Sequence, residues 1–356
     1  MRILLIRLRE IGDVVFTTPA IRAIRRQFPD AYITYMVEPA AAPVVQGNPH
    51  LNEVIVTRGL RGAAGAVDDL AIIRRVRAGH YDVVVDFHSG PRSSLIAFLS
   101  GATRRIGYDV PGRGWMYTTR VPRPREIRAR HAVANQWDLL DTLGIQTPDP
   151  MRSPTEMAVD ARAADAVAAR LLALGVLDPH ELIVLHVSAG NPFRRWPADA
   201  FASLVATLVH DRPRRRIVVV SGPSEKGAAA RVIDLARSRV GAEERDCILP
   251  AQQFTLAELR ALMDRASLFV GGDSGPLHIA STSAVPIAGI YGPTLPVRSE
   301  PWRGPESPSE AAEVAGLACR PCDQRVCVHG DFRCLTWLAP EQVLEAAERA
   351  LARAKG

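Results

Sequence analysis

The stretch VGGDSGPLHIASTSAVPIAGIYGPT, residues 270–294, decides how this sequence folds. An apolar strand over residues 267–270 runs into a glycine-rich turn with an acid and a hydroxyl, and a helix of small residues follows. Unpaired N–H groups and aligned peptide dipoles at a helix N-terminus attract anions. The stretch therefore predicts a phosphate-binding turn at the end of a buried strand. The residues expected to form it are Gly271, Gly272, Ser274 and Gly275.

The same turn also has a purely structural interpretation. Asp273 or Ser274 would cap the helix, and Pro276 would start it. His278 would then be an interior histidine with its hydrogen bonds satisfied. Position favours the phosphate site, because ligands of doubly wound sheets bind beyond the carboxyl ends of the strands.

Outward from this stretch, the chain alternates apolar strands and helices in two runs. At 356 residues it suits two domains of about 150 residues each. Near-continuous β-branched runs indicate parallel strands buried on both faces, so each run predicts a doubly wound α/β domain, with a cleft between the two. The predicted strands are residues 2–7, 31–37, 52–56, 81–87, 181–187, 216–222, 247–249, 267–272 and 286–292; the predicted helices include 18–28, 68–78 and 340–355.

A polar, Pro-rich stretch at residues 144–157 is the best candidate for a linker between the domains. The predicted domains are residues 1–158 and 159–338, followed by a C-terminal helix at 339–356 that is considered for a crossing back to the first domain.

Composition is ordinary for a soluble protein, with 47% hydrophobic and 23% charged residues. No apolar run approaches the roughly 20 residues of a membrane-spanning helix. The N-terminus MRILLIRLREIGD has arginines in its apolar stretch and no small-residue cleavage site, so it predicts a strand and a cytoplasmic protein. The net charge of +6 comes from arginine, and predicts either a solvated surface or a basic face for phosphate or anionic lipid. No nucleic-acid-binding motif is found.

Two further strand ends in the second run carry candidate ligand-binding side chains. After residues 181–187, Ser188 and Arg195 can bind a phosphate, although Arg195 is equally well explained as a surface residue stacked on Trp196. After residues 216–222, Glu225 can accept both hydroxyls of a ribose, or can simply be a favourable charge at a helix start.

The first strand of the chain is followed by an acid, Asp13, directly after Gly12. Thr18 and Pro19 are typical of an N-cap and a first helical residue, which leaves Asp13 in the preceding loop. From there it would face the cleft and act as a general base. The alternative is a structural loop aspartate.

Together these segments resemble the heptosyltransferases of lipopolysaccharide core synthesis, glycosyltransferase family 9, over nearly the whole chain. The resemblance rests on IRLREIGDVVFTTPAIRAIRRQFPDA at residues 6–31, YDVVVDFHSGPRSSLIAFLSGATRRIGYD at 81–109, RRWP at 194–197, SGPSE at 221–225, the opening stretch, and CRPCDQRVCVHGDFRC at 319–334.

The resemblance implies a GT-B fold of two Rossmann-like domains, in which the first holds the acceptor and the second holds a nucleotide-sugar. It implies inverting transfer from ADP-L-glycero-D-manno-heptose to the lipid A–Kdo/heptose core. The enzyme would work as a peripheral protein on the cytoplasmic face of the inner membrane. No metal cofactor is required in this scheme, although Mg²⁺ can assist at Asp273.

Family roles transfer to matching positions of this sequence. Asp13 matches the base that deprotonates the acceptor. The donor-binding positions are Ser188 and Arg195 on the phosphates, Glu225 on the ribose, Ser274 and Gly275 in the diphosphate turn with Asp273 beside it, and His278 without an assigned role.

The acceptor is anionic, so arginines of the first domain are candidates to bind it. Each is also explained as an exposed, solvated side chain. The acceptor candidates are Arg58, Arg61, Arg92, Arg130 and His131, and Arg22, Arg25 and Arg26 of the predicted helix 18–28 are candidates for contact with anionic lipid headgroups.

Four clustered cysteines, Cys319, Cys322, Cys327 and Cys334, have a C-x₂-C-x₄-C-x₆-C spacing. In a cytosolic chain such thiols can hold zinc or an iron–sulfur centre, and disulfides are disfavoured. The alternative is a structural device of heptosyltransferase II-like relatives.

Two other functions compete with heptose transfer. One is a related glycosyltransferase that uses another nucleotide-sugar or acceptor. The other is a catalytically silent nucleotide-sugar-binding or redox-sensing protein of the same fold. Asp13 separates them, because a silent protein has no need of an acid there.

Overall fold

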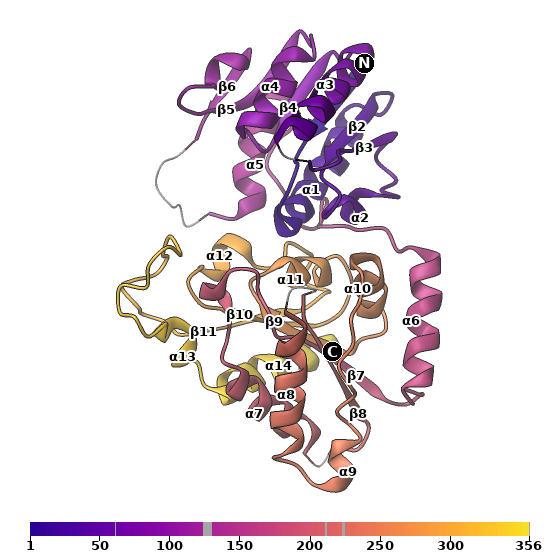
Figure 1. The fold of residues 1–356 in the computed structure, drawn as a ribbon, viewed down its shortest axis with the longest axis vertical. Coiled ribbons are helices and arrows are strands. Elements are labelled where there is room, and N and C mark those ends of the chain that lie inside the picture. The colour runs from indigo at the N-terminus through magenta and orange to yellow at the C-terminus, as the bar shows by residue number, and fades with distance from the viewer. Residues whose placement is uncertain (61, 124–129, 211, 223–224, 356) are drawn as a thin grey trace. The chain divides into compact units, whose positions relative to one another are not determined.

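The structure is a computed structural model that describes residues 1–60, 62–123, 130–210, 212–222 and 225–355 (Figure 1). The chain divides into two compact units, Met1–Ala158 and Val159–Gly356. Each unit is built around one parallel sheet. None of the helices in the described residues combines the length and apolar character of a bilayer span.

The first unit has a six-stranded parallel sheet in the order β3-β2-β1-β4-β5-β6. This is the strand order of a dinucleotide-binding fold, and it reverses direction between β1 and β4. The strands are β1 (Arg2–Ile6), β2 (Tyr32–Val37), β3 (Glu53–Val56), β4 (Val83–Asp86), β5 (Arg104–Asp109) and β6 (Thr119–Pro122). The helices are α1 (Ile11–Gln27), α2 (Ala42–Val45), α3 (Gly62–Ala78), α4 (Pro91–Leu99) and α5 (Ala132–Leu140), with short 3₁₀ turns at Gly114–Met116 and Asp141–Leu143.

The second unit has a five-stranded parallel sheet in the order β11-β10-β9-β7-β8. The predicted strand at 247–249 forms one isolated parallel bridge to β8, from Ile248 to Ile217, and a second bridge joins Gln252, just beyond it, to Val220. With this segment counted beside β8, the second sheet has the same order as the first. The strands are β7 (Glu181–His186), β8 (Arg215–Val220), β9 (Leu268–Gly272), β10 (Ile287–Tyr291) and β11 (Ser309–Glu313). The helices are α6 (Ala161–Ala173), α7 (Ala198–Val209), α8 (Lys226–Arg237), α9 (Ala242–Arg245), α10 (Leu256–Met263), α11 (Gly275–Ala280), α12 (Pro296–Ser299), α13 (Arg333–Thr336) and α14 (Pro340–Lys355), with a 3₁₀ turn at Pro192–Arg194.

Most of the strands that the sequence predicts are buried on both faces; the exception is the partly buried edge strand β3. Residues 3–6 of β1 have no exposed surface, and every residue of β9 is buried. The strands that were missed, β5, β6 and β11, lie at or near sheet edges and carry arginines, a proline or glutamates. Strands at such positions do not need apolar side chains on both faces, so their sequences lack the continuous β-branched run by which the other strands were predicted.

Helix α1 begins at Ile11, earlier than predicted, which corrects the position of Asp13. Asp13 lies in the first turn, and the expected N-cap and first residue, Thr18 and Pro19, lie inside the helix. A proline inside a helix leaves the carbonyl four residues earlier without its N–H donor. Here the Thr18 hydroxyl donates to the Val15 carbonyl at 2.7 Å and takes the place of that donor.

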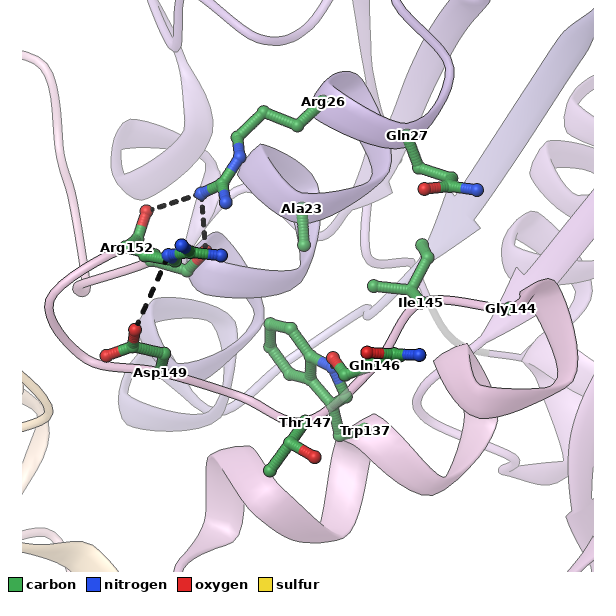
Figure 2. A pocket seen from close by; sticks show the side chains of 11 residues that line it. Ala23, Arg26, Gln27, Trp137, Gly144, Ile145, Gln146, Thr147, Asp149 and Arg152 are labelled. Atoms are coloured by element: carbon green, nitrogen blue, oxygen red, sulfur yellow. Dashed lines mark hydrogen bonds and ion pairs between the residues drawn. The ribbon is translucent and has the colours of Figure 1, made fainter.

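The predicted linker at 144–157 is packed against the first unit rather than free. The Trp137 indole N–H donates to the Gln146 carbonyl at 2.5 Å, and Arg26 donates to the Arg152 carbonyl at 2.7 Å. Figure 2 shows these side chains around a cavity of about 630 Å³ between the end of α1 and this segment.

The C-terminal helix α14, considered for a crossing back to the first domain, packs within the second unit. It lies against α7, β10 and β11. Its Val343 and Ala347 are fully buried in the core of that unit, and Arg353 pairs with Glu310 of β11 at 2.7 Å.

We predict that Thr18→Val destabilises the first unit by about 2 kcal/mol, because the buried hydroxyl also accepts a bond from the Glu156 N–H at 2.9 Å. Urea unfolding followed by tryptophan fluorescence measures the loss. The matched control is Thr103→Val, whose exposed hydroxyl donates to the Asp82 carbonyl at 3.1 Å. The control is expected to stay within about 0.5 kcal/mol of the parent, and an equal loss in both variants would contradict the role of Thr18.

Candidate functional site

In the second unit, the candidate site lies where the strand order reverses, beyond the ends of β7 and β9. Ser188 follows β7, and its Oγ accepts a bond from the Gly222 N–H at 2.8 Å, which ties it to the end of β8. Its Oγ lies 3.4 Å from Nε2 of His186, the last residue of β7. Burial lowers the pKa of His186 to about 4, so this imidazole is neutral at physiological pH.

Asp273, directly after β9, carries a buried negative charge between two side chains. Its carboxylate lies 3.4 Å from Arg194 and 3.3 Å from Nε2 of His278. Burial by itself raises the pKa of Asp273. The bond and charge of His278, the charge of Arg194 and the Thr294 hydroxyl outweigh that effect and lower this pKa to about 2. The carboxylate therefore stays ionised and internally paired.

Arg194, which the sequence analysis missed, is the arginine that reaches the Asp273 turn. Its guanidinium also donates to the Asp273 backbone carbonyl at 3.0 Å. Sequence favoured its neighbour Arg195, and only the 3₁₀ turn at Pro192–Arg194 decides which of the two points to the turn. Gly272 eases this approach, because a Cβ there would lie 3.2 Å from the Arg194 carbonyl oxygen and would push it back slightly.

The predicted phosphate-binding Arg195 and ribose-binding Glu225 form an ion pair with each other. Arg195 is further held by its Nε–H, which donates to the Ala189 carbonyl at 2.7 Å. The Glu225 side chain is mostly buried, and that of Arg195 is about half exposed. The structure thus brings the two predicted residues together in one place.

Ser274 occupies the N-cap position of α11, but its side chain makes no capping hydrogen bond to the helix. Its hydroxyl donates to the Gly272 carbonyl at 3.1 Å instead. The turn is therefore not the capped helix of the purely structural interpretation, and the first N–H groups of α11 lack a side-chain cap.

In the first unit, the strand order reverses between β1 and β4, and Arg7 joins the ends of these strands. Arg7 NH1 donates to the Phe87 carbonyl at 2.9 Å, and NH2 pairs with Oδ2 of Asp13. The Asp13 side chain is 39% exposed, so a ligand can reach it. The predicted base is thus oriented by an arginine that the sequence analysis did not single out.

His88, directly after β4, is a second missed residue at this switch point. Burial, followed by the positive charges of Arg7 and Arg9, lowers its pKa to about 4, so the ring is neutral at physiological pH. Ser89 has φ +48°, and Glu10, just before α1, has φ +67°. Left-handed backbone at non-glycine residues is costly and clusters at functional sites.

The arginines expected to bind the acceptor have acidic partners or face solvent. The Arg58 side chain is 79% exposed and lies 3.9 Å from Asp68, and Arg61 lies outside the described residues. Arg92 pairs with three carboxylates, so it brings no net positive charge to a ligand. Its partners are Glu38 at 3.3 Å, Asp68 at 3.3 Å and Asp69 at 2.6 Å.

Arg130 and His131 have local structural contacts at the start of α5. Arg130 pairs with Asp138 at 2.8 Å. His131 is the N-cap of the helix, and its Nδ1 accepts the Val133 N–H at 3.1 Å. The His131 ring also packs edge-on against Phe16 of α1, with ring centroids 5.1 Å apart, in the helix whose first turn carries Asp13.

The three α1 arginines expected to meet lipid headgroups are also engaged. Arg22 pairs with Glu156. Arg25 donates to the carbonyls of Pro29 and Ala31, each at 2.7 Å. Arg26 bonds the 144–157 segment (Figure 2).

All four clustered cysteines line a cavity of about 340 Å³ together with Phe193, Pro293 and Phe332. Burial raises the pKa of Cys334 to about 11, whereas backbone N–H groups lower the pKa of the more accessible Cys327. Across the described ranges, no three histidine, cysteine or acidic side chains are arranged to hold a metal ion.

Comparison with known proteins supports the fold and the family of this chain. The sequence pattern of glycosyltransferase family 9 (heptosyltransferase) matches residues 70–332, which is the greater part of the chain. Lipopolysaccharide heptosyltransferase 3 of Escherichia coli strain K12 is 29% identical over 306 residues, which cover 83% of this chain and 83% of that protein.

Two solved structures show the same architecture. The glycosyl transferase family 9 protein from Veillonella parvula DSM 2008 has a TM-score of 0.83 at 24% identity, and the match covers 99% of this chain and 97% of that chain. The E. coli ADP-heptose LPS heptosyltransferase II has a TM-score of 0.77 at 18% identity, with 100% of both chains covered. The predicted GT-B class, with two Rossmann-like domains, is confirmed.

We predict that Asp273→Asn lowers the free energy of unfolding by about 2 kcal/mol near pH 7, because two pKa units of stabilisation are lost. The folded pKa is depressed, so the contribution is complete above about pH 4 and is lost as the pH falls towards 2. The ionisable groups facing the carboxylate are Arg194, His278 and Tyr291.

Denaturant unfolding of parent and variant between pH 2 and 7 measures this difference. Asp199→Asn is the control, since the Asp199 side chain is 75% exposed and its pair with Arg239 is solvated. A difference between parent and Asp273→Asn that does not shrink towards pH 2 would contradict the assignment.

Proposed function

The chain belongs to glycosyltransferase family 9, the heptosyltransferase family, and we propose that it transfers a heptose from ADP-L-glycero-D-manno-heptose to the inner core of lipopolysaccharide. The observation that carries this proposal is the chemistry at the two strand-order reversals. One has a glycine turn, arginines and an uncapped helix start, which suit a diphosphate, and the other has an exposed carboxylate held by an arginine. Similarity to proteins named for lipopolysaccharide and for ADP-heptose supports this choice of substrates.

The donor would bind in the second unit at the ends of β7, β8 and β9. The Ser274–Gly275 turn and Ser188 would bond the phosphate oxygens, and Arg195 would leave Glu225 to pair with the diphosphate. Glu225 would then accept the ribose hydroxyls. Asp273 and His278 hold Arg194 beside the turn, and their mutual pairing keeps the Asp273 charge from repelling the phosphates.

The reaction would be a single displacement with inversion at the anomeric carbon. The acceptor hydroxyl oxygen forms the new bond as the bond from the sugar to ADP breaks. Asp13 takes the hydroxyl proton, and the bond from Arg7 to Oδ2 leaves Oδ1 as the oxygen proposed to receive it. Negative charge that develops on the departing diphosphate would be stabilised by the α11 N–H groups and the arginines.

We propose that no metal cofactor takes part in this step. Mg²⁺ at Asp273 was considered from sequence, but that carboxylate is buried and already lies between Arg194 and His278. A divalent cation there would have to displace the Arg194 guanidinium and the His278 ring from the carboxylate, and a cation beside Arg194 would be repelled by its charge.

The acceptor would approach Asp13 in a field that is net positive. Arg7, Arg9 and Arg123 all act on His88 beside it, against the single charge of Asp13. This field suits an anionic acceptor such as a Kdo-bearing or phosphorylated core. We place the reaction at the cytoplasmic surface of the inner membrane, where a lipid-linked acceptor would be reached by peripheral association.

We predict that Asp13→Ala lowers kcat by about 10²–10⁴-fold, because the acceptor hydroxyl loses its base. The affinity for ADP is expected to remain within about twofold of the parent, because Asp13 belongs to the first unit. Transfer assays and calorimetry measure the two quantities.

Arg195→Ala is the complementary variant and is expected to weaken ADP binding. If Asp13→Ala lowered kcat and the affinity for ADP by equal factors, the role of Asp13 as the general base would be contradicted.

The proposed donor is tested by calorimetric comparison of ADP, UDP and GDP. We expect ADP to bind most tightly and transfer from ADP-heptose to a purified core acceptor to continue in EDTA. Mass spectrometry of the acceptor identifies the product. Tighter binding of UDP or GDP would overturn the donor, and loss of turnover in EDTA would overturn metal-free transfer.

A further inference from the structure

The loop from Cys319 to Cys334 has no role in the proposed reaction, yet one of its side chains contacts the donor site. This side chain is Gln324, which is half-buried. It lies two residues after Cys322 and belongs to neither of the strands that define the site.

Gln324 joins two of the loops that follow the strands of the second unit. Its Oε1 accepts from Nδ2 of Asn191 at 2.9 Å and from Nε of Arg194 at 2.7 Å, both in the loop after β7. Its Nε2 lies 3.5 Å from the Thr294 hydroxyl, in the loop after β10. Two donors on one oxygen also fix which way the amide points.

Both sets of contacts lead on to Asp273, in the turn between them. Arg194 donates to the Asp273 backbone carbonyl at 3.0 Å and faces its carboxylate at 3.4 Å. Thr294 is a further group that lowers the pKa of the same carboxylate. Gln324 therefore acts on Asp273 by two separate routes.

The loop backbone is itself held in an unfavourable conformation at this point. Gln324 has φ +60°, which costs a non-glycine residue free energy. The Cys322 Sγ accepts the Gln324 N–H at 3.3 Å, and this bond helps to hold the residue there. Arg320 and Phe332 of the loop also contact the loops after β10 and β7, but Gln324 is the residue whose side chain bonds both Arg194 and Thr294.

We propose that Gln324 is a positioning residue for the donor diphosphate, which it serves by holding Arg194 and Thr294 against the Asp273 turn. The cysteine-containing loop is then a wall of the nucleotide site. The inference rests on the proposed function for the identity of the ligand, but its geometry lies within the second unit.

The test is a double-mutant cycle on the full-length protein, with ADP affinity measured by calorimetry and no acceptor present. Gln324→Ala is expected to weaken ADP binding about 10-fold or more, as loss of a bond to a charged group does. Because Gln324 acts partly through Arg194, the double variant is expected to cost less than the sum of the two single losses, and the Thr294 contact accounts for the remainder. Full additivity, or unchanged affinity in Gln324→Ala, would overturn the proposal.

Arg325→Ala is the matched control from the next position in the loop. The Arg325 side chain is 85% exposed, and its one ion pair, to Asp323, lies at 3.9 Å. ADP affinity is expected to be unchanged. An equal loss of ADP affinity in Arg325→Ala and Gln324→Ala would show a general effect of the loop and would overturn the specific role of Gln324.

A second measurement needs no nucleotide, so it separates this inference from the proposed function. The Asp273 carboxyl is titrated by ¹³C NMR in parent and Gln324→Ala. We expect a higher midpoint in the variant, because Arg194 and Thr294 are released from the carboxylate. An unchanged midpoint would overturn the positioning role, whereas failure of the parent to bind ADP would overturn only the donor.

Discussion

Parallel strands that are buried on both faces impose the constraint on which this protein depends. Each connection must cross from the carboxyl end of one strand to the amino end of the next, and where the strand order reverses, successive connections diverge. The divergence leaves the ends of β1 and β4 uncovered in one sheet, and those of β7 and β9 in the other. This geometry explains the positions of Asp13 and Asp273. Asp13 lies in the first turn of the helix that follows β1, and Asp273 directly follows β9. Their neighbours then determine their chemistry: Arg7 orients the first, and Arg194 and His278 flank the second.

Much of this arrangement is predictable from sequence, for a physical reason. A strand buried on both faces must be apolar throughout, so the central strands are visible as β-branched runs, and residues that end them can be named in advance. Ser188 and Asp273 were found in this way. The edge strands β6 and β11 and the neighbouring strand β5 were missed, because their sequences carry arginines, a proline or glutamates in place of a continuous apolar run. The start of α1 was misplaced because Thr18 and Pro19 imitate a helix start, while the Thr18 hydroxyl supplies the hydrogen bond that Pro19 cannot.

Side-chain partners over long sequence separations were beyond prediction. Nothing local distinguishes Arg194 from Arg195, and a single 3₁₀ turn sends one to Asp273 and the other to Glu225. Arg92 has the right charge for an anionic ligand, but α3 and the end of β2 place three carboxylates around it. Gln324 has no sequence signature at all. In each case the side chain that forms the contact lies more than 15 residues away along the chain, so neither the hydrophobic periodicity nor the spacing of a motif could predict the pair.

The ion pair between Arg195 and Glu225 has a consequence for selectivity. Under the proposed roles, each of the two charged groups must exchange its partner for a different part of one nucleotide. Free pyrophosphate would pair with the Arg195 guanidinium but leave the mostly buried Glu225 carboxylate without a partner. A nucleoside without phosphates would bond Glu225 and leave Arg195 without its ion pair. Only a molecule that offers an anion and a vicinal diol at the correct separation compensates both groups at once, so this ion pair would discriminate against fragments of the proposed ligand.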